Sequence, residues 1–447
     1  MFKWFLLLIA YLPFQIALNP RPTFDLASLR VFIVLLFIIW LRKMALGKLR
    51  IPKILSLVRS RNLQGIGLFL FFILAGLSLI GAENIIWGLR KMVFFLSILP
   101  LYFLVIALAD NWLKIKKTVF VLISGAGLIA LVGLGQFIAS FIFGLEKTYQ
   151  FWAWNIVPVF SGFNFGALIL AYPSWLVNVN GQTILRAFSL FSDPHMLSFY
   201  LGLTLPLVVA LLGVRARYLP SPKINLFFII YCLLFITLLL TFTRGAYFAI
   251  IVTFLVLAGL FWRYLKAKKI ALLLCLSLLI FIIPITPIAD RFYSSFDMSD
   301  GSSAGRLEIW QQAGRTAMEH LWQGVGLGNY SLLVDPEFGY RNPITAHNLY
   351  LDILSEIGIF ALIVWLVLIL GTIWQLFWQI RIAKGSDLNR GQTLMRIGLI
   401  GSLVYFSVHS FFETSIYHPP ILALLMIILG LSTLAVKASR AVPKECP

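Results

Sequence analysis

The sequence predicts an all-α integral membrane protein with about twelve transmembrane helices and a long external loop that carries short helices. Three observations lead to this fold class. The 447 residues are 60% hydrophobic. Only 12% are charged, which is about half the share in an ordinary globular domain. Apolar runs recur along the whole chain, so no soluble core could contain them all.

Twelve of these runs have about the length that a helix needs to cross a bilayer. They lie near residues 4–18, 29–41, 65–82, 92–109, 118–143, 196–213, 224–241, 246–263, 270–288, 348–378, 397–413 and 420–436. We interpret the first run as a span rather than a signal peptide, because no small-residue cleavage site follows it. We therefore expect residues 1–447 to form a single integral membrane domain.

The formal net charge of +19 could suggest a nucleic-acid partner, but the distribution of the charges does not. Basic residues gather in short clusters between apolar runs, at residues 42–61, 114–117, 215–223, 263–269, 381–396 and 437–444. This alternation is typical of cytoplasmic loops beside anionic lipid. It predicts a lipid bilayer as the partner, no nucleic acid, and both termini in the cytoplasm.

Residues 157–177 are apolar enough to suggest one more span. That span would reverse every later loop and place three basic clusters outside. The stretch also contains residues that interrupt a helix: Pro158, Gly162, Gly166 and Pro173. We therefore expect residues 144–195 to lie outside, partly re-entrant or in the interface. Three tryptophans suit interfacial anchoring: Trp152, Trp154 and Trp175.

Residues 289–346 form the longest hydrophilic segment, and the span count places them outside. A helical pattern runs to Trp322, and the glycine-rich segment Gly324–Tyr330 follows. The glycine spacing is similar to that of a phosphate-binding loop. However, no βαβ context and no Gly-Lys-Ser/Thr accompany it, so we expect a tight turn.

His347 ends this loop at the edge of a long apolar run. Histidine can accept and return a proton near neutral pH. Asp352 and Glu356 follow, in what we expect to be the same span, and intramembrane carboxylates usually have a function. Two structural alternatives remain: His347 could be a buried structural histidine, and Glu356 could belong to a structural ion pair.

Three arginines fall on the same outer side by the span count: Arg186, Arg244 and Arg306. A guanidinium stays charged and binds phosphate with a planar fork, so a group of arginines would suit a pyrophosphate at the membrane surface. Arg244 could instead cap a helix or reach lipid headgroups, and Arg306 could be solvated. His195 could line the site or belong to a helix start. No histidine or cysteine spacing indicates a metal site, so we expect no metal and no other cofactor.

The order of these motifs resembles the signature of the O-antigen ligase and polymerase superfamily. The specific part is Arg306-x-x-x-Trp310, Gly324-Val-Gly-Leu-Gly328, His347-Asn-x-x-Leu351 and Glu356-x-Gly358. Upstream, Thr243-Arg244-Gly245 resembles a Ser/Thr-Arg-Gly element. Phe191-Ser-Asp-Pro-His195 resembles a Phe-x-Asn-Pro-Asn element, with Asp193 and His195 at the asparagine positions. The resemblance extends over residues 186–430.

The resemblance implies a metal-independent, inverting glycosyltransferase of the bacterial cytoplasmic (inner) membrane that takes part in cell-surface polysaccharide biosynthesis. Such enzymes move a glycan from undecaprenyl pyrophosphate to an acceptor hydroxyl of a glycan, lipid or protein at the outer face. The implied catalytic base is His347. Arg244 and Arg306, with Arg186, would hold the donor pyrophosphate, and Glu356 and His195 would support the site.

A second function stays open from the residues alone. Cations among twelve spans could also serve a transporter of a small anion such as bicarbonate. Transporters often have internal repeats with broken helices at the midplane. This sequence shows no repeat, and its candidate residues gather at one face, which favours the transferase.

Overall fold

The protein is described here from a computed structural model, which covers residues 1–21, 24–47, 62–162, 170, 174–179, 181–213, 221–283, 286–296, 301–334, 345–382 and 390–437. The described residues are predominantly helical, with two small antiparallel hairpins, β1–β2 and β3–β4. Parts of the predicted basic clusters, at residues 48–61, 214–220, 383–389 and 438–447, lie outside the described residues.

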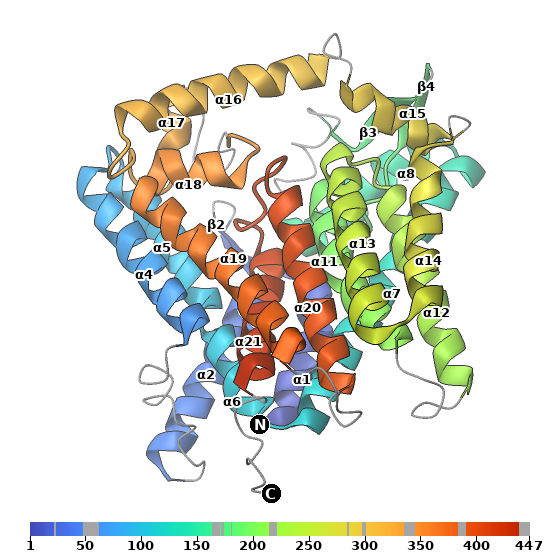
Figure 1. Cartoon of the computed structure of the whole chain (residues 1–447). Coiled ribbons are helices and arrows are strands. Elements are labelled where there is room, and N and C mark those ends of the chain that lie inside the picture. Colours follow the sequence, from blue (N-terminus) through green and yellow to red (C-terminus); the bar gives the residue numbers. More distant parts are fainter. Residues whose placement is uncertain are drawn as a thin grey trace, which may run out of the picture.

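The helices of the N-terminal third are spread across the helical bundle, from one side to the other (Figure 1). Its elements are α1 (Phe2–Tyr11), β1 (Ala17–Arg21), β2 (Phe24–Ala27), α2 (Ser28–Ala45), α4 (Leu63–Leu77), α5 (Ile85–Ile98), α6 (Pro100–Leu108) and α7 (Trp112–Ile142). Short 3₁₀ turns extend α1 and α4, and Pro100 begins α6, where a proline needs no intrahelical partner.

The middle of the chain contains α8 (Leu145–Phe151), α9 (Val157–Ser161), β3 (Leu176–Val179), β4 (Gln182–Leu185), α11 (Pro194–Leu212), α12 (Ser221–Leu239), α13 (Arg244–Leu265) and α14 (Lys268–Ser277). The last third contains α15 (Pro287–Tyr293), α16 (Gly301–Glu319), α17 (Tyr330–Val334), α18 (Leu349–Ile357), α19 (Ile359–Ile382), α20 (Arg390–His409) and α21 (Pro419–Lys437).

Seven stretches of the described residues are long and apolar enough to cross a membrane: Leu63–Gly81, Ile85–Leu108, Trp112–Ile142, Pro194–Leu212, Arg244–Leu265, Ile359–Ile382 and Pro419–Lys437. Two shorter apolar helices, Phe2–Phe14 and Leu226–Leu239, accompany them. The prediction of an all-α, multi-pass membrane protein therefore agrees with the structure. The count of twelve spans stays a prediction.

The span predicted at residues 348–378 is wrong as a single helix. Gly358 separates α18 from α19 and has a positive φ of +93°. A Cβ at this position would lie 2.4 Å from the carbonyl oxygen of Trp322, so the break also depends on a close backbone approach. Asp352 and Glu356 consequently lie in a short helix of their own rather than inside a membrane-spanning one.

Residues 144–162 and 174–195 do not form a further long apolar helix. They contain α8, a π-helical turn at Trp152–Ile156, α9 and the β3–β4 hairpin. Exposed Trp154 fits the expected interfacial position. Trp175 does not, because it is fully buried and stacks on Phe188 with ring centroids 3.7 Å apart.

Helices α11, α20 and α21 form the centre of the bundle, and most of their side chains are buried. Gly202 on α11 lets the ring of Tyr405 on α20 approach, since a Cβ there would lie 1.9 Å from it. The Tyr405 hydroxyl then donates to the carbonyl of Ser198 at 2.9 Å. This tight contact fixes the end of α20 relative to the start of α11, where polar residues of both helices meet.

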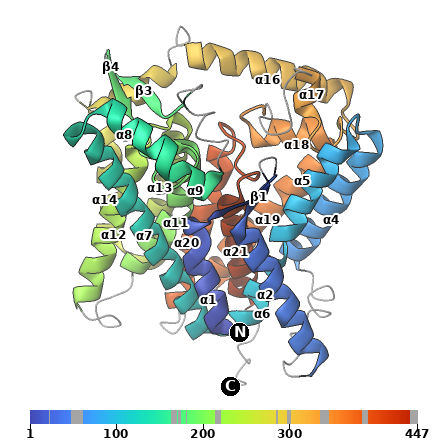
Figure 2. The ribbon, with the colours of Figure 1, turned by 180° about the vertical axis from the view of Figure 1, so that it is seen from behind.

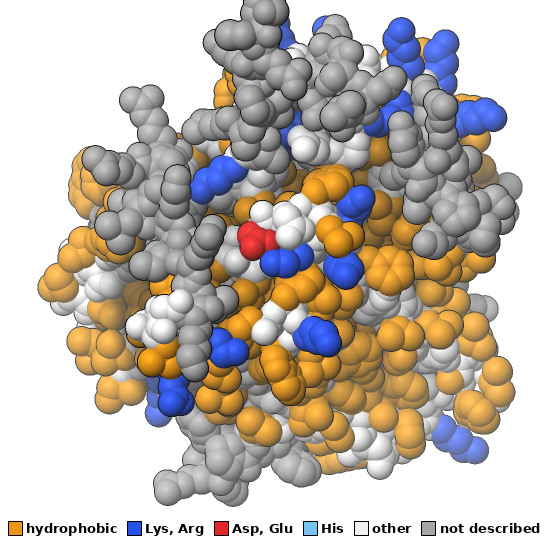
Figure 3. All heavy atoms as spheres, turned by 90° about the horizontal axis from the view of Figure 1, so that it is seen from below, with side chains coloured by type: hydrophobic (Ala, Val, Ile, Leu, Met, Phe, Trp, Pro, Cys, Tyr) orange, Lys and Arg blue, Asp and Glu red, His pale blue; other side chains and the backbone are white. Residues whose placement is uncertain are grey.

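The two ends of the bundle differ. The N-terminus and the end of α21 lie at one end, and α16 lies across the other, as the front and rear views show (Figures 1 and 2). Helices that reach the terminal end finish in basic residues, with Arg42 and Lys43 on α2, Arg263 on α13 and Arg381 on α19. Figure 3 shows this face, where Lys and Arg side chains are scattered among apolar ones. The opposite end, under α16, holds the candidate site residues.

Candidate active site

His347 and Glu413 form an ion pair at the α16 end of the bundle. His347 Nδ1 lies 3.0 Å and 3.1 Å from the two carboxylate oxygens of Glu413. The His347 side chain is 44% exposed, whereas that of Glu413 is 10% exposed. If Nδ1–H donates to the carboxylate, Nε2 is left as an acceptor. The pair therefore joins a largely buried carboxylate to a partly exposed imidazole.

The charges of the two residues reinforce each other. The Glu413 carboxylate raises the pKa of His347 and outweighs burial, which lowers it. Burial by itself raises the pKa of Glu413, but the charges of His347, His195 and Arg306 hold that pKa below its ordinary value. Glu413 is thus ionised and can orient the imidazole.

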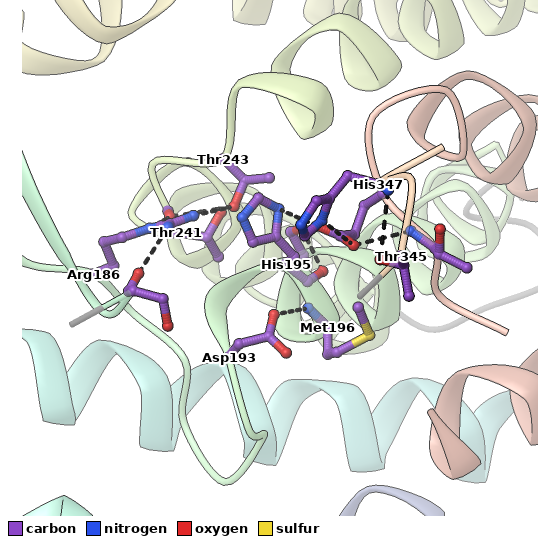
Figure 4. A network of polar contacts seen from close by, with 12 residues as sticks. Arg186, Asp193, His195, Met196, Thr241, Thr243, Thr345 and His347 are labelled. Atoms are coloured by element: carbon purple, nitrogen blue, oxygen red, sulfur yellow. Dashed lines mark hydrogen bonds and ion pairs between the residues drawn. The ribbon is translucent and has the colours of Figure 1, made fainter. Parts of the chain in front are cut away.

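His195 lies on the other side of the same carboxylate. Its Nδ1 is 3.7 Å from Glu413 Oε2, and it occupies the first turn of α11. Figure 4 shows the rings of His195 and His347 beside one another. The prediction that His195 lies near the site agrees with this geometry, although the two residues are far apart in the sequence.

The segment that leads to His195 is held from several sides. Asp193 caps α11 by accepting the backbone N–H of Met196 at 3.0 Å. Burial, together with the charge of Glu413, raises the pKa of Asp193 to about 6. Gln136 on α7 accepts the backbone N–H groups of Phe188 and Ser189 at 3.0 and 2.9 Å. The Asp-Pro-His motif is therefore both a helix start and a wall of the site.

Arg186 binds protein groups in the turn that precedes α13. It donates to the carbonyls of Thr241 and Ser174 at 2.7 and 3.0 Å, and to the hydroxyl of Thr243 at 2.9 Å (Figure 4). Burial, followed by the charge of Arg291, lowers its pKa to about 9. These contacts give Arg186 a role in holding the turn before Arg244. Its predicted direct contact with pyrophosphate stays a prediction.

Arg244 is buried and begins α13. The next residue explains the Thr-Arg-Gly sequence, because a Cβ at Gly245 would lie 2.5 Å from Phe412 Cβ and 3.1 Å from His409 Cδ2. Glycine thus lets the start of α13 contact the end of α20, immediately before Glu413. The fold brings Arg244 close to the segment that carries Glu413.

Helix α16 brings Arg306 to the same cluster. The charge of Arg306 lowers the pKa of both His347 and Arg186, so it lies within electrostatic reach of each. Trp310, one turn later, approaches Phe412 with ring centroids 6.5 Å apart. On the same helix, Ala313 packs in a small apolar cluster with Ala346. The Arg-x-x-x-Trp spacing therefore places α16 over the neighbours of both Glu413 and His347.

Backbone strain concentrates around the site. Among the described residues, four non-glycine residues have positive φ: Ser189, Phe242, Lys266 and His347. Three of them belong to the candidate site: Ser189 precedes His195, Phe242 precedes Arg244, and the third is His347 itself. Such conformations cost about 1–3 kcal/mol each and persist only where the surroundings hold them, often at functional sites.

The glycine-rich segment after α16 is a tight turn, as predicted. Gly324, Gly326 and Gly328 all have positive φ. Its backbone N–H groups are used within the protein: Val325 N donates to the Ser355 carbonyl at 2.8 Å, and Gly326 N to the Glu356 carbonyl at 3.0 Å. The turn therefore docks on α18 instead of facing a phosphate.

Glu356 belongs to a separate ion pair. Lys91 Nζ lies 2.9 and 2.8 Å from its two carboxylate oxygens, and the Tyr417 hydroxyl donates to it at 3.0 Å. The Lys91 ammonium also lies 3.5 Å from the centre of the Tyr417 ring. These contacts agree with the structural alternative for Glu356.

The sequence analysis named Asp352 but missed Glu413 and Arg291. A signal for Glu413 was present: it is a carboxylate in the short connection between two apolar runs, where charges are costly. Arg291 on α15 donates to the carbonyl of Phe242 at 3.5 Å, beside Arg244. Among the described residues, no group of three or more His, Cys, Asp or Glu is arranged to hold a metal ion.

Comparison with protein-family models matches part of the chain. The family model described as O-Antigen ligase matches residues 227–366, the segment that holds Arg244, Arg306 and His347. It ends before Glu413 and begins after His195. No curated protein matches the chain. The match supports glycan transfer of the O-antigen ligase or polymerase type and gives no support to the anion transporter. Over residues 227–366, the chain is therefore similar to the O-antigen ligase family.

Proposed function

We propose that the protein transfers a glycan from an undecaprenyl-pyrophosphate-linked oligosaccharide to an acceptor hydroxyl, at the outer face of the bacterial cytoplasmic membrane. The observation that carries the proposal is the His347–Glu413 pair. Its Nδ1 side is closed by a buried carboxylate, whereas the ring is 44% exposed. A histidine held in this way is suited to act as a general base through Nε2.

The proposed reaction is a single inverting displacement. Nε2 of His347 takes the proton of the acceptor hydroxyl while the acceptor oxygen forms a bond to the anomeric carbon from the face opposite the leaving group. The bond between that carbon and the pyrophosphate oxygen breaks, and undecaprenyl pyrophosphate leaves with the electron pair. Glu413 stabilises the imidazolium, which later releases its proton to water.

Arg244 and Arg306 are the groups that we assign to the donor pyrophosphate. Arg306 on α16 acts electrostatically on Glu413, and Arg244 begins α13, where the next residue, Gly245, contacts Phe412 beside Glu413. Fixed cations at a leaving group stabilise the charge that develops as the bond breaks. Because this leaving group is already a phosphate, two guanidinium groups can supply that stabilisation without a metal.

Arg186 has a supporting task in this proposal. Its bonds to Thr241 and Thr243 hold the turn from which Arg244 starts. His195 shares the Glu413 carboxylate with His347 and helps to fix it. Glu356 acts only through the placement of α18.

The proposed orientation rests on charge. The N-terminus and the basic helix ends lie at the end of the bundle opposite α16 (Figure 1). Basic residues favour the cytoplasmic side of a bilayer. Both termini would then be cytoplasmic, and the site would open at the outer face, where lipid-linked glycans are used.

The decisive experiment replaces His347 with Ala in a deletion strain whose membranes supply the native donor and acceptor. Loss of glycan transfer, with lipid-linked donor accumulating, is the expected result. His320→Ala is the matched control, since His320 is an exposed histidine at the end of α16, on the same face. Normal transfer by a His347→Ala protein that is folded and present in the membrane would contradict the proposal.

A further inference from the structure

Asp352 is a buried carboxylate that the proposed mechanism does not use, and it contacts the chain neighbours of both His347 and Glu413. Its Oδ1 accepts the backbone N–H of Ala346 at 2.8 Å. Its Oδ2 accepts the hydroxyl of Thr414. Ala346 directly precedes His347, and Thr414 directly follows Glu413. One side chain on α18 thus joins the two loops that carry the ion pair.

Thr414 makes the link to Glu413 direct. Its hydroxyl donates to Asp352, while its backbone N–H donates to Glu413 Oε1 at 3.0 Å. A shift of Asp352 would therefore move a donor that holds the Glu413 carboxylate. Such a change is transmitted through two hydrogen bonds, without any contact between Asp352 and a substrate.

The other end of the link holds a strained residue. His347 has a φ of +47°, which a residue with a side chain adopts only when its surroundings hold it there. The bond from Ala346 N–H to Asp352 fixes the peptide immediately before it. Asn348 fixes the residues after it by capping α18, where its side chain accepts the N–H groups of Tyr350 and Leu351.

Helix α18, which carries Asp352, is held in place by hydrogen bonds to the end of α20 and the residue that follows it. The backbone N–H of Leu349 donates to the Ser410 carbonyl at 2.9 Å, and the Tyr350 hydroxyl donates to the Ser407 carbonyl at 2.8 Å. These bonds fix α18 to the end of α20. Asp352 extends that anchoring to the residues on which the distance between imidazole and carboxylate depends.

We propose that Asp352 is a positioning residue that sets the geometry of the His347–Glu413 pair by holding Ala346 and Thr414. This inference rests on the proposed function of His347. Its role is distinct from catalysis, since its carboxylate is buried and bonds to the protein groups of Ala346 and Thr414. The catalytic group remains His347, and Asp352 acts through the backbone on each side of the pair.

The test compares Asp352→Ala with Asp352→Asn. Alanine removes both hydrogen bonds. Asparagine keeps an acceptor for Ala346 N–H, and its amide can donate to the Thr414 hydroxyl, which rotates to accept. We expect Asp352→Ala to lower kcat by about 10²-fold, as small displacements of catalytic groups do, with little change in KM for the lipid-linked donor. Asp352→Asn should restore most of kcat.

The pH profile of kcat separates positioning from general loss of structure. His347 must be neutral to act, so activity rises as the pH rises through its pKa. The charge of Glu413 and the hydrogen bond to Glu413 raise that pKa, and both effects weaken if Glu413 moves away from the imidazole. The rising limb should therefore move to lower pH in Asp352→Ala. A lower kcat without this shift, or without rescue by asparagine, would overturn the inference.

Three further variants serve as a control and as an independent test of the same link. Ser355→Ala is the matched control, because its buried hydroxyl bonds only to the Asp352 carbonyl within α18. It should leave kcat and the pH profile unchanged.

If Asp352→Ala does not fold, Thr414→Val breaks the same link from the other side, and Thr414→Ser keeps the hydroxyl. Thr414→Val should lower kcat and shift the limb, whereas equal behaviour of both Thr414 variants would refute the link.

The inference and the proposed function fail in different ways. Activity in His347→Ala would refute the function, whatever Asp352 does. An inactive His347→Ala together with a fully active, unshifted Asp352→Ala would refute only the positioning role.

Discussion

Two ion pairs at the same end of the molecule show how similar residues serve different purposes. Lys91–Glu356 and His347–Glu413 each join a cation to a carboxylate near α18. In the first pair the side chains are only 14% and 6% exposed, and Tyr417 covers both partners. In the second, Glu413 is buried but His347 is 44% exposed. A closed pair fixes helices, whereas a half-open pair leaves one nitrogen for a substrate.

The two pairs also differ in what surrounds them. Arg306, and the start of α13 with Arg244, lie near Glu413, and His195 shares its carboxylate. Glu356 has Lys91 and Tyr417 as partners, and its carbonyl accepts a backbone N–H from the glycine turn. The surroundings of Glu413 thus provide groups suited to a phosphorylated donor, whereas those of Glu356 provide contacts within the protein. Substitutions at four residues test this contrast: His347, Arg244, Glu413 and Lys91.

The largest effect on transfer is expected from His347. His347→Ala or His347→Gln removes the general base and should lower kcat by about 10²–10⁴-fold. Transfer from the lipid-linked donor in membranes measures it, with protein amount checked by immunoblot. His320→Ala should match wild type, and equal loss in that control would point to a general effect on the external face.

Arg244 is expected to follow. Arg244→Ala should lower kcat by about 10²-fold, because one fixed cation at the leaving group is lost. Arg244→Lys should keep the charge but lose the bidentate fork, so its rate should fall between alanine and wild type. Single-turnover rates with saturating donor give the comparison. A fully active Arg244→Lys would show that the fork has no role.

Glu413→Gln tests the buried end of the open pair. It should lower kcat by about 10–100-fold, as loss of an orienting partner does. Glu413 raises the pKa of His347, so its neutralisation should also move the rising limb of the pH profile to lower pH. A profile identical to wild type would mean that Glu413 does not control the protonation of His347.

The smallest effect on kcat is expected at the closed pair. Lys91→Met leaves the Glu356 carboxylate buried without its cation, which should destabilise the fold by about 3–5 kcal/mol. The double variant Lys91→Met, Glu356→Gln should recover much of that loss. Thermal unfolding in detergent measures stability. A drop in kcat as large as that of Glu413→Gln, in protein that is still folded, would remove the contrast between the two pairs.

The predicted elements that succeeded depend on local patterns. Apolar runs of sufficient length predict helices because a bilayer leaves backbone groups no other partner. The glycine turn at 324–328 was recognisable because positive φ favours glycine. The family resemblance also followed from short motifs, and the match to residues 227–366 agrees with it.

The errors depend on packing between distant segments. The single span at 348–378 failed because Gly358 meets the Trp322 carbonyl, a contact that hydropathy does not report. Trp175 was expected in the interface, yet Phe188 stacks on it in the interior. Glu413 was missed because its partner His347 lies 66 positions away along the chain.

The sequence by itself determined that this is a membrane protein and that its basic residues gather in loops between apolar runs. It also identified His347, Arg244 and Arg306 as candidate site residues. Composition and short motifs carry that information because each depends on neighbouring residues. Only the tertiary structure decided which carboxylate belongs to which cation. Glu356 and Glu413 are both sparse acids near apolar helices, and the packing of α11, α16, α18 and α20 alone gives one to Lys91 and the other to His347.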